Sequence, residues 1–420
     1  MKRRIPFAAK LDYTRPMGRF FRDNARWLMA GFTLTLCSSF GQTFFISLFA
    51  GEIKAVYGLS DGDWGGIYTV ATLASAAVLV QAGGLADTMG LRRLSLMVLG
   101  LYVAVALGMA VNGSVWVLVA LIAGLRFCGQ GMMSHIGITA MGRWFRAHRG
   151  RAVAVAGLGH SVGEAVLPSI AVALLLLIGW RATWGLVAVV MVLGFAPVIA
   201  LLLDEGRRPK GEAELILSAG IGGRQWSRGD VLRHWLFWAL LPGLLAPSFI
   251  GTSAFFHQVH VSEVKGWALA VMALGYPAYA GVTVVSALAC GWLVDRIGPV
   301  RLLPVYLLPM GAAMAVLTLG ANAGAWHAAM ALMGMTQGIG ATLYGALWPE
   351  LFGTRHLGAV KALAAAVMVL ATALGPGITG MLIDQGVMFP DQGWVLALWC
   401  AAASAVFLAV SARLRREMAA

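Results

Sequence analysis

The sequence predicts an all-α membrane protein with twelve transmembrane helices arranged in two similar halves. Three observations lead to this fold class. The 420 residues are 60% hydrophobic and only 12% charged, whereas about a quarter of the residues of a soluble domain are charged. Apolar runs of about the 20 residues that cross a bilayer as a helix recur along the whole chain. A short loop motif also occurs twice, once in each half.

Each predicted helix is an apolar run that stops where charged residues, glycine or proline gather. Only helices and closed barrels cross a bilayer, because unpaired backbone groups are costly in hydrocarbon. Runs of this length favour helices over strands. We predict the spans at 27–49, 65–84, 94–111, 115–141, 152–178, 182–203, 235–256, 267–290, 302–321, 326–350, 361–383 and 393–412.

A repeat divides the chain into two halves. An offset of 208 positions relates four pairs of residues: Asp87 and Asp295, Gly90 and Gly298, Gly150 and Gly358, and Pro168 and Pro376. A constant offset across unrelated local compositions predicts a duplicated unit of about half the chain. We therefore expect an N-terminal tail, a six-helix bundle, a linker, a second six-helix bundle and a C-terminal tail, at 1–26, 27–203, 204–234, 235–412 and 413–420.

The basic residues predict the orientation in the membrane. Of the 31 Lys and Arg residues, 27 fall in the two tails and in alternate loops. Because cytoplasmic loops carry the excess of Lys and Arg, both termini are expected in the cytoplasm. The net charge of +13 is shared among separate loops rather than gathered on one face, which argues against a nucleic-acid partner. We expect a multi-pass protein of the plasma membrane, the inner membrane of a bacterium.

The repeated loop motif lies between predicted helices, where a charged segment has to leave the bilayer. It reads GGLADTMGLRR from Gly83 to Arg93 and GWLVDRIGPVR from Gly291 to Arg301. A carboxylate at the rim can accept hydrogen bonds from the start of a helix in the other half, and neighbouring Arg residues can pair across the seam. Such contacts would lock one face shut. The residues of this predicted latch are Gly83, Asp87, Gly90, Arg92, Arg93, Gly291, Asp295, Gly298 and Arg301.

Two details of the motif lead to further expectations. Gly90 is expected to occupy a turn that needs a residue without a Cβ atom. The second copy lacks the double Arg and contains Pro299. We therefore expect the second copy to form the weaker latch.

This loop signature resembles that of the major facilitator superfamily of secondary transporters, and the resemblance covers the whole chain. It implies two pseudo-symmetric six-helix bundles, a cavity between them and transport by alternating access. RFCGQG, which begins at Arg126, is similar to the fourth-span signature of the superfamily, whose Arg is tied to proton movement. Here Gln130 stands where a glycine is usual. The fifth span and the segment before it resemble bacterial relatives of monocarboxylate and oxalate–formate carriers.

Two residues within the predicted membrane depth are clearly ionised, Arg126 in the fourth span and Glu164 in the fifth. A charge at the bilayer centre costs a few kcal/mol unless it lines a cavity or is paired. One interpretation is an Arg126–Glu164 ion pair that joins two helices. The other is that one or both line the cavity and bind substrate or a proton. His160 lies one helical turn before Glu164, so both face the same way and could form a proton site.

Other polar side chains in the spans are weaker candidates for substrate or proton binding. Structural hydrogen bonding inside the core is the alternative for each of them. The candidates are Gln42 in the first span, Gln130 in the fourth, His257 at the outer end of the seventh, Tyr276 in the eighth and Gln337 in the tenth.

These observations predict a secondary active transporter that moves a small organic solute by proton-coupled alternating access. An organic anion such as a monocarboxylate is expected, with Arg126 as its counter-charge. The alternative is proton-driven efflux of apolar or cationic compounds, with Glu164 as the acceptor. Lipid, protons and a small-molecule substrate are the expected partners of a monomer.

Other functional classes find less support in the sequence. No phosphate-binding loop or nucleophile–base motif is found, so ATP drive and a membrane enzyme are not expected. The four cysteines lie within apolar runs without metal-ligand spacing, and we expect no metal or cofactor. A transport-silent receptor would often need a long soluble domain, which the sequence lacks.

Overall fold

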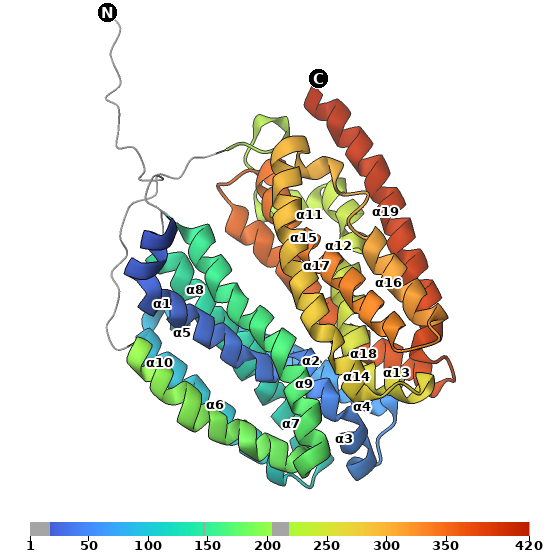
Figure 1. Cartoon of the computed structure of the whole chain (residues 1–420). Coiled ribbons are helices and arrows are strands. Elements are labelled where there is room, and N and C mark those ends of the chain that lie inside the picture. Colours follow the sequence, from blue (N-terminus) through green and yellow to red (C-terminus); the bar gives the residue numbers. More distant parts are fainter. Residues whose placement is uncertain (1–16, 146–147, 204–217, 420) are drawn as a thin grey trace, which may run out of the picture.

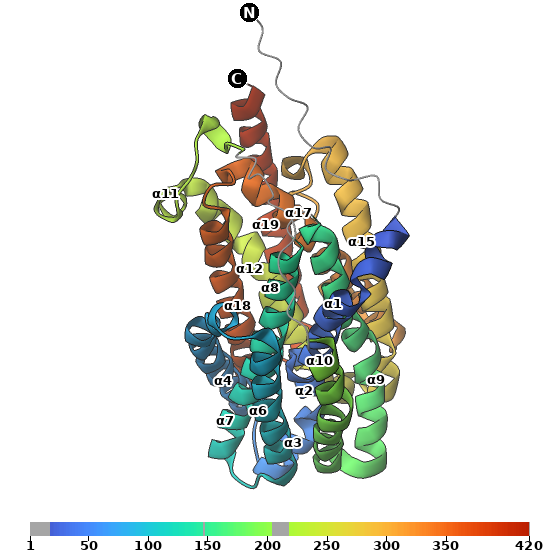
Figure 2. The ribbon, with the colours of Figure 1, turned by 90° about the vertical axis from the view of Figure 1, so that its left-hand side faces the viewer.

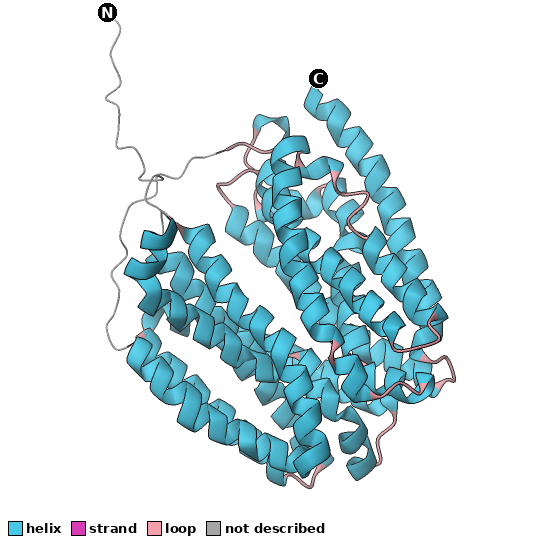
Figure 3. Cartoon of the chain, in the orientation of Figure 1, coloured by secondary structure: helices cyan, strands magenta, loops and turns pink. Residues whose placement is uncertain are grey.

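The computed structural model describes residues 17–145, 148–203 and 218–419. Every regular element in these residues is a helix (Figure 3), as the sequence predicts. The predicted N-terminal tail falls largely outside the described residues, and so does the polar first part of the predicted linker.

The first half of the chain contains the elements up to α10. Three of its spans are interrupted by short 3-10 or π-helical segments. Its elements are α1 (Met17–Cys37), η1 (Ser38–Gly41), α2 (Thr43–Ile46), η2 (Ser47–Phe49), α3 (Ala50–Tyr57), α4 (Asp61–Ala82), α5 (Leu85–Thr88), α6 (Leu91–Val111), α7 (Val115–Leu125), η3 (Arg126–Met133), α8 (Ser134–Trp144), α9 (Arg149–Val190), η4 (Met191–Phe195) and α10 (Ala196–Leu202).

The second half begins after the linker and contains longer uninterrupted helices. Two short helices, η5 and α11, precede its first span. Its elements are η5 (Ile221–Gly223), α11 (Arg228–Arg233), α12 (Trp235–Phe256), α13 (Gln258–Lys265), α14 (Leu269–Ala273), α15 (Gly275–Ile297), η6 (Pro299–Arg301), α16 (Leu308–Leu319), α17 (Gly324–Phe352), α18 (Leu357–Asp384) and α19 (Phe389–Ala419).

The described helices account for the predicted spans. By length and hydropathy eight of them can cross a membrane, or nine if the bent pair Phe20–Gly41 and Thr43–Tyr57 counts as one span. The helical stretch Gly150–Leu202 covers the fifth and sixth predicted spans, which meet at Gly179 with φ of +77°. The ninth and tenth predicted spans fall on α16 and α17. Each predicted span therefore coincides with a helix or with helices joined at a break.

The first span is broken near its middle. After α1, a 3-10 turn ends at Gly41, and Gln42 is extended before α2 begins at Thr43. The two parts of the span meet at an angle of 44°. Ser and Gly are weak helix formers, which favours a break in the sequence SSFG. A Cβ atom at Gly41 would collide with the Leu125 carbonyl oxygen, so glycine is required where this break contacts the fourth span.

The two halves meet at one end of the molecule and lean apart toward the other (Figures 1 and 2). We call the end that holds α3, the start of α4 and α13 the closed side, and the end that holds the start of α1 and the end of α19 the terminal side. Hydrogen bonds join the halves from Ser47 Oγ to the Phe255 carbonyl, from Thr69 Oγ1 to the Ala373 carbonyl, from Gln258 Nε2 to Ser47 Oγ, and from Ser60 Oγ to Asp384.

The closest contact between the halves is a glycine seam between α4 and α18, which lie side by side in both views. It consists of Gly62, Gly65, Gly377 and Gly380. A Cβ atom at Gly65 would lie 2.9 Å from the Pro376 carbonyl carbon, and one at Gly380 would lie 2.9 Å from the Asp61 carbonyl carbon. The backbones of the two helices can approach this closely only because these positions have no side chain.

The linker ends in the short helix α11. Ser227 and Asp230 form a capping box at the start of α11, with Ser227 Oγ accepting from the Asp230 N–H. The Asp230 carboxylate accepts in return from the Ser227 N–H at 2.9 Å. The hydrogen bond that Ser227 Oγ donates to this carboxylate at 2.6 Å, together with the one from the Ser227 N–H, lowers the pKa of the Asp230 carboxyl below its usual value.

Candidate functional site

A cavity of about 520 Å³ lies between the two halves. Side chains from the broken first span, η3, α9, α12, α15, α17 and α18 line it. Five residues that the sequence singled out are among them: Gln42, Gln130, His160, Glu164 and Gln337. The arrangement therefore brings together polar groups from four separate predicted spans.

Glu164 and His160 face this cavity because of how α9 packs. On its other side α9 lies against the first span, where a Cβ atom at Gly159 would collide with α1 and one at Gly163 with Ser39 of η1. The next residue of a helix points about 100° further round its axis. The glycines at 159 and 163 therefore hold α9 close to α1, and His160 and Glu164 turn toward the centre of the molecule.

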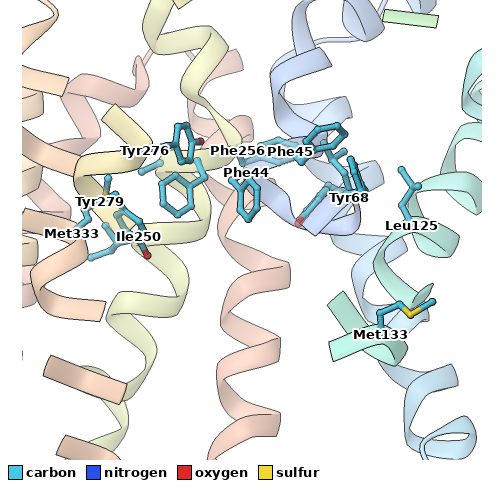
Figure 4. Close-up of a cluster of buried hydrophobic side chains, with 14 of the residues drawn as sticks. Phe44, Phe45, Tyr68, Leu125, Met133, Ile250, Phe256, Tyr276, Tyr279 and Met333 are labelled. Atoms are coloured by element: carbon cyan, nitrogen blue, oxygen red, sulfur yellow. The ribbon is translucent and has the colours of Figure 1, made fainter. Parts of the chain in front are cut away.

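Glu164 is a buried carboxyl group, 7% exposed, that lines the cavity. No described residue makes a hydrogen bond or ion pair with it. The His160 ring meets the Phe44 ring edge-on at a centroid distance of 5.9 Å. Figure 4 shows Phe44 between the two halves, with Tyr276 and Tyr279 on the side of the second half, and the Phe44 and Tyr276 rings are 6.0 Å apart. The carboxyl group thus belongs to an aromatic surrounding.

Arg126 is not among the residues that line the cavity. Its side chain forms hydrogen bonds at the break in the first span instead. Its Nη1 donates to the Gly41 carbonyl at 3.4 Å and to Thr43 Oγ1 at 3.3 Å. Its guanidinium lies 5.1 Å from the centre of the Tyr68 ring, and the residue is 2% exposed. The side chain thus satisfies a carbonyl that the break leaves without a helical partner. Arg126 also begins the π-helical segment η3, a feature often found at functional positions.

The Arg126–Glu164 ion pair considered from the sequence is not formed. The hydrogen bonds of Arg126 go to Gly41 and Thr43, and no described residue pairs with Glu164. The Arg126 side chain is bound at the break in the first span. The close contact of α9 with the first span turns the Glu164 carboxyl group toward the cavity. That interpretation of the two charges is therefore wrong for this conformation.

Two further candidates lie away from the cavity surface. The Tyr276 hydroxyl donates to Gln258 Oε1 at 3.0 Å and is fully buried. His257 lies on the closed side, where its ring contacts Thr379 and Phe389. Neither residue is among those that line the cavity.

The first copy of the predicted latch makes its described contacts within its own half. Arg143 Nη1 donates to the Ala86 carbonyl at 2.6 Å, and His135 Nε2 lies 3.2 Å from the Gly83 carbonyl oxygen. The side chain of Asp87 lies outside the described part of the structure. Arg92 and Arg93 are exposed at the start of α6. The latch therefore stays a prediction.

The glycine argument for the latch applies to its second copy rather than its first. Gly90 has φ of −61° and ψ of 130°, which any residue adopts, and a Cβ atom there would meet nothing within 4 Å. The expectation that Gly90 needs to lack a Cβ is therefore wrong. Gly298, in contrast, has φ of +79°, a conformation that L residues rarely adopt. Asp295 and Arg301 beside it are exposed, and Gly291 is partly buried in α15.

A second hollow, of about 990 Å³, lies on the terminal side. It is lined by the segment from Ser218 to Trp226 and by the end of α17, including Glu350. None of the residues singled out from the sequence lines it. Its position at the rim of one half argues against a transport pathway.

The structure also reveals groups that the sequence did not single out. Phe44 lies in the cavity lining directly after the break in the first span. On the closed side, Asp61 and Asp384 bind groups of the opposite half. These two acids could have been singled out from the sequence, because few charged residues occur near the predicted outer ends of the spans.

Solved structures of the same fold are found in the comparison with known proteins. A bacterial homolog of the human lysosomal transporter Spinster, inward-facing and occupied, matches with a TM-score of 0.65 and 18% identity, covering 95% of this chain and 96% of that one. The inward-facing, unoccupied form of a bacterial Spinster homolog matches with a TM-score of 0.63 and 17% identity, covering 94% and 95%. No curated protein matches the sequence. At these identities the structural likeness shows the fold.

The family follows from the sequence itself. The profile of the Major Facilitator Superfamily matches residues 31–376 and, in a second match, residues 262–419. Together these ranges cover both halves and nearly all of the described helices. The chain therefore belongs to the Major Facilitator Superfamily of membrane transporters.

Proposed function

We propose that this transporter exchanges protons for an apolar or cationic organic solute and that Glu164 is the group at which the two compete. One observation carries the proposal. Glu164 lines the cavity without a hydrogen-bond or ion-pair partner among the described residues, whereas Arg126 is held at the break of the first span. The cavity therefore offers a substrate a carboxyl group rather than a guanidinium or ammonium group.

The composition of the cavity surface supports a cation over an anion. No Lys or Arg is found among its described lining residues, and Glu164 is the one Asp or Glu. Aromatic side chains that include Phe44, Phe255 and Tyr279 line it as well. Aromatic faces attract cations, and their ring surfaces also bury apolar groups. An organic anion would need a positive partner, and Arg126 is 2% exposed.

A single carboxyl group can couple the two fluxes because it cannot hold a proton and pair with a cation at the same time. When the acid is protonated, the buried site is neutral and avoids the cost of an isolated charge in a low-dielectric cavity. A bound cation replaces the proton as the compensating charge. Substrate binding therefore releases a proton, and reprotonation releases substrate.

The proposed orientation is compatible with efflux. The excess of Lys and Arg in the tails and alternate loops supports a cytoplasmic terminal side in the bacterial inner membrane. In that orientation the halves separate on the cytoplasmic side. Substrate would enter from the cytoplasm and leave on the closed side, as efflux requires.

The test measures binding and proton release on the same purified protein. Tetraphenylphosphonium is the cationic probe and benzoate the anionic one, each titrated in weak buffer between pH 5 and 9 with a pH electrode. We expect tetraphenylphosphonium to bind and to release protons. Glu164→Gln should weaken this binding more than a hundredfold, since loss of a buried charge partner is worth ~3–5 kcal/mol, and it should abolish proton release.

Glu350→Gln is the matched control, because this glutamate lies in the other half and lines only the second hollow. It should bind the probe and release protons like the unmodified protein. Proton release that persists in Glu164→Gln would remove Glu164 from coupling. Binding of benzoate but not of tetraphenylphosphonium would overturn the cationic substrate class in favour of an anion.

A further inference from the structure

A cluster of titratable side chains joins the two halves on the closed side. Asp61, the first residue of α4, lies in the first half, and His257 and His260 come from the second half at the end of α12 and in α13. His260 Nδ1 is 3.4 Å from Asp61 Oδ2, and His257 Nδ1 is 4.0 Å from Asp61 Oδ1. Lys54 of α3 lies 2.8 Å from Asp61 Oδ1. This cluster is separate from the cavity, whose lining includes none of these residues.

The hydrogen bonds of His257 fix which of its ring nitrogens carries the hydrogen. Nε2 faces Thr379 Oγ1 at 2.9 Å and the Pro376 carbonyl at 3.3 Å. The Thr379 hydroxyl donates its own hydrogen to the Gly375 carbonyl at 2.7 Å. Both neighbours of Nε2 therefore accept, and Nε2 has to donate. In the neutral ring Nδ1 is then bare, so an added proton can bind only at Nδ1, the atom that faces Asp61.

Asp61 already has donors for its charge. The Lys54 ammonium contacts Oδ1. The Phe389 N–H donates to His260 Nε2 at 3.5 Å, which leaves Nδ1 of a neutral His260 to donate to Asp61. One carboxylate thus faces one ammonium and one imidazole N–H. A proton on His257 would add a positive charge to a group whose charges already balance.

The other elements around His257 supply no compensating charge. From α18 it meets the Thr379 hydroxyl and the Pro376 carbonyl, and from α19 the Phe389 ring at a centroid distance of 5.4 Å. Asp384 is engaged elsewhere, since its Oδ2 accepts from Ser60 Oγ at 2.7 Å and from the Gly62 N–H at 3.0 Å. Lys54, Asp61 and His260 are therefore the charged or titratable groups that reach His257 among the described residues.

Burial of His257 in the closed arrangement disfavours the protonated, charged form of its ring. The residue follows the last position of α12 and is 2% exposed. Burial lowers the pKa of His257 to about 3, and the charge of Asp61 opposes this shift only in part. When the halves separate on this side, water reaches the ring, and a hydrated histidine has a pKa of about 6.5. The open arrangement therefore binds the proton more strongly than the closed one.

We propose that His257 is a proton-binding site on the closed side and that a proton bound at Nδ1 favours separation of the halves there. The sign follows from linkage. A lowered pKa in the closed arrangement means that closure is fully favoured above pH 6.5 and is progressively lost as the pH falls below it. With pKa values of about 6.5 and 3, the ratio of open to closed molecules should rise about tenfold between pH 7.5 and 5.5.

The experiment measures the separation of the halves directly. Spin labels at Val56→Cys on α3 and Val264→Cys on α13 report the distance across the closed side, since both positions are exposed, at 51% and 45%. The four native cysteines are buried and free, so they compete poorly for the label. Double electron–electron resonance on protein in lipid nanodiscs between pH 7.5 and 5.5 should show about a tenfold rise in the ratio of long to short distances.

His257→Asn is the decisive variant, because an amide can still donate to Thr379 but cannot take up a proton. It should lose the response to pH. His327→Asn is the matched control, since His327 bonds to the Val271 carbonyl within its own half, and it should keep the response.

Several results would overturn the proposal. One is a response that persists in His257→Asn, and another is a long distance that becomes rarer at low pH. An absence of any response in the labelled protein with His257 intact would also overturn it, and this measurement does not depend on whether the variant folds. No substrate is added, so failure here leaves the proposed role of Glu164 untouched.

Discussion

Replacing Gly65 with Ala should separate the halves on the closed side, whereas replacing Gly66 should not. A Cβ atom at Gly65 would lie 2.9 Å from the Pro376 carbonyl carbon and 3.0 Å from the Gly377 Cα atom. Real Cβ atoms essentially never approach another atom closer than 3.0 Å, and both close neighbours belong to backbone that cannot turn aside. A Cβ atom at Gly66 would meet nothing within 4 Å. The two glycines are neighbours on one helix and differ only in what they face.

The size of the effect follows from where the collision occurs. Overpacking typically costs ~1–3 kcal/mol, and here the cost falls only on the arrangement in which α4 and α18 touch. A free-energy difference of this size shifts an equilibrium by about 5-fold to 150-fold. Alanine also gains about 1 kcal/mol of helix propensity over glycine, but both variants share this gain. Their difference therefore isolates the contact with α18.

The distance between labels at Val56→Cys and Val264→Cys, measured at constant pH 7.5, tests this reasoning. Gly65→Ala should increase the population with the longer distance, and Gly66→Ala should leave the distribution unchanged. Circular dichroism and size-exclusion chromatography show whether both variants are folded. If the two folded variants give the same distribution, the close approach of α4 and α18 does not hold the closed side together.

Two further predictions concern backbone breaks. Gly298→Ala should lower the thermal unfolding temperature, because a backbone φ of +79° costs a residue other than glycine about 1–3 kcal/mol of strain. Gly90→Ala is the control and should not lower it. Equal melting curves for the two variants would contradict this prediction. Arg126→Lys should also destabilise the protein, because an ammonium would replace the guanidinium that donates to Gly41 and Thr43. Losing a hydrogen bond to a charged group costs about 1–3 kcal/mol. An unchanged melting curve would contradict this prediction.

Hydropathy and charge carried most of the fold prediction. Length and apolar content predict a helix for each span, because a backbone in hydrocarbon has to satisfy its hydrogen bonds internally. The broken first span was missed, since a window average does not register the extended residue Gln42. The π-helical segment that begins at Arg126 was also missed, because a window average does not register it. Both features depend on contacts between spans rather than on composition.

The candidate site was predicted in part. Glu164 and His160 reach the cavity as their helical spacing suggested, together with Gln42, Gln130 and Gln337. The role of Arg126 could not be derived, because the carbonyl that it binds exists only where the first span breaks. The partners of His257 come from residues more than a hundred positions away, and no local pattern in the sequence indicates them.

The glycine seam has no equal on the opposite flank of the closed side. The repeat offset relates Gly62, Gly65, Gly377 and Gly380 to Ala270, Ala273, Ser169 and Val172. These positions carry side chains where the seam has none, and Ser169 Oγ donates to the Ala273 carbonyl at 3.3 Å. We therefore expect the halves to part first between α9 and α14, and the α4–α18 seam to separate last. Glu164 is on α9 and would be the first group of the cavity to meet water on the closed side.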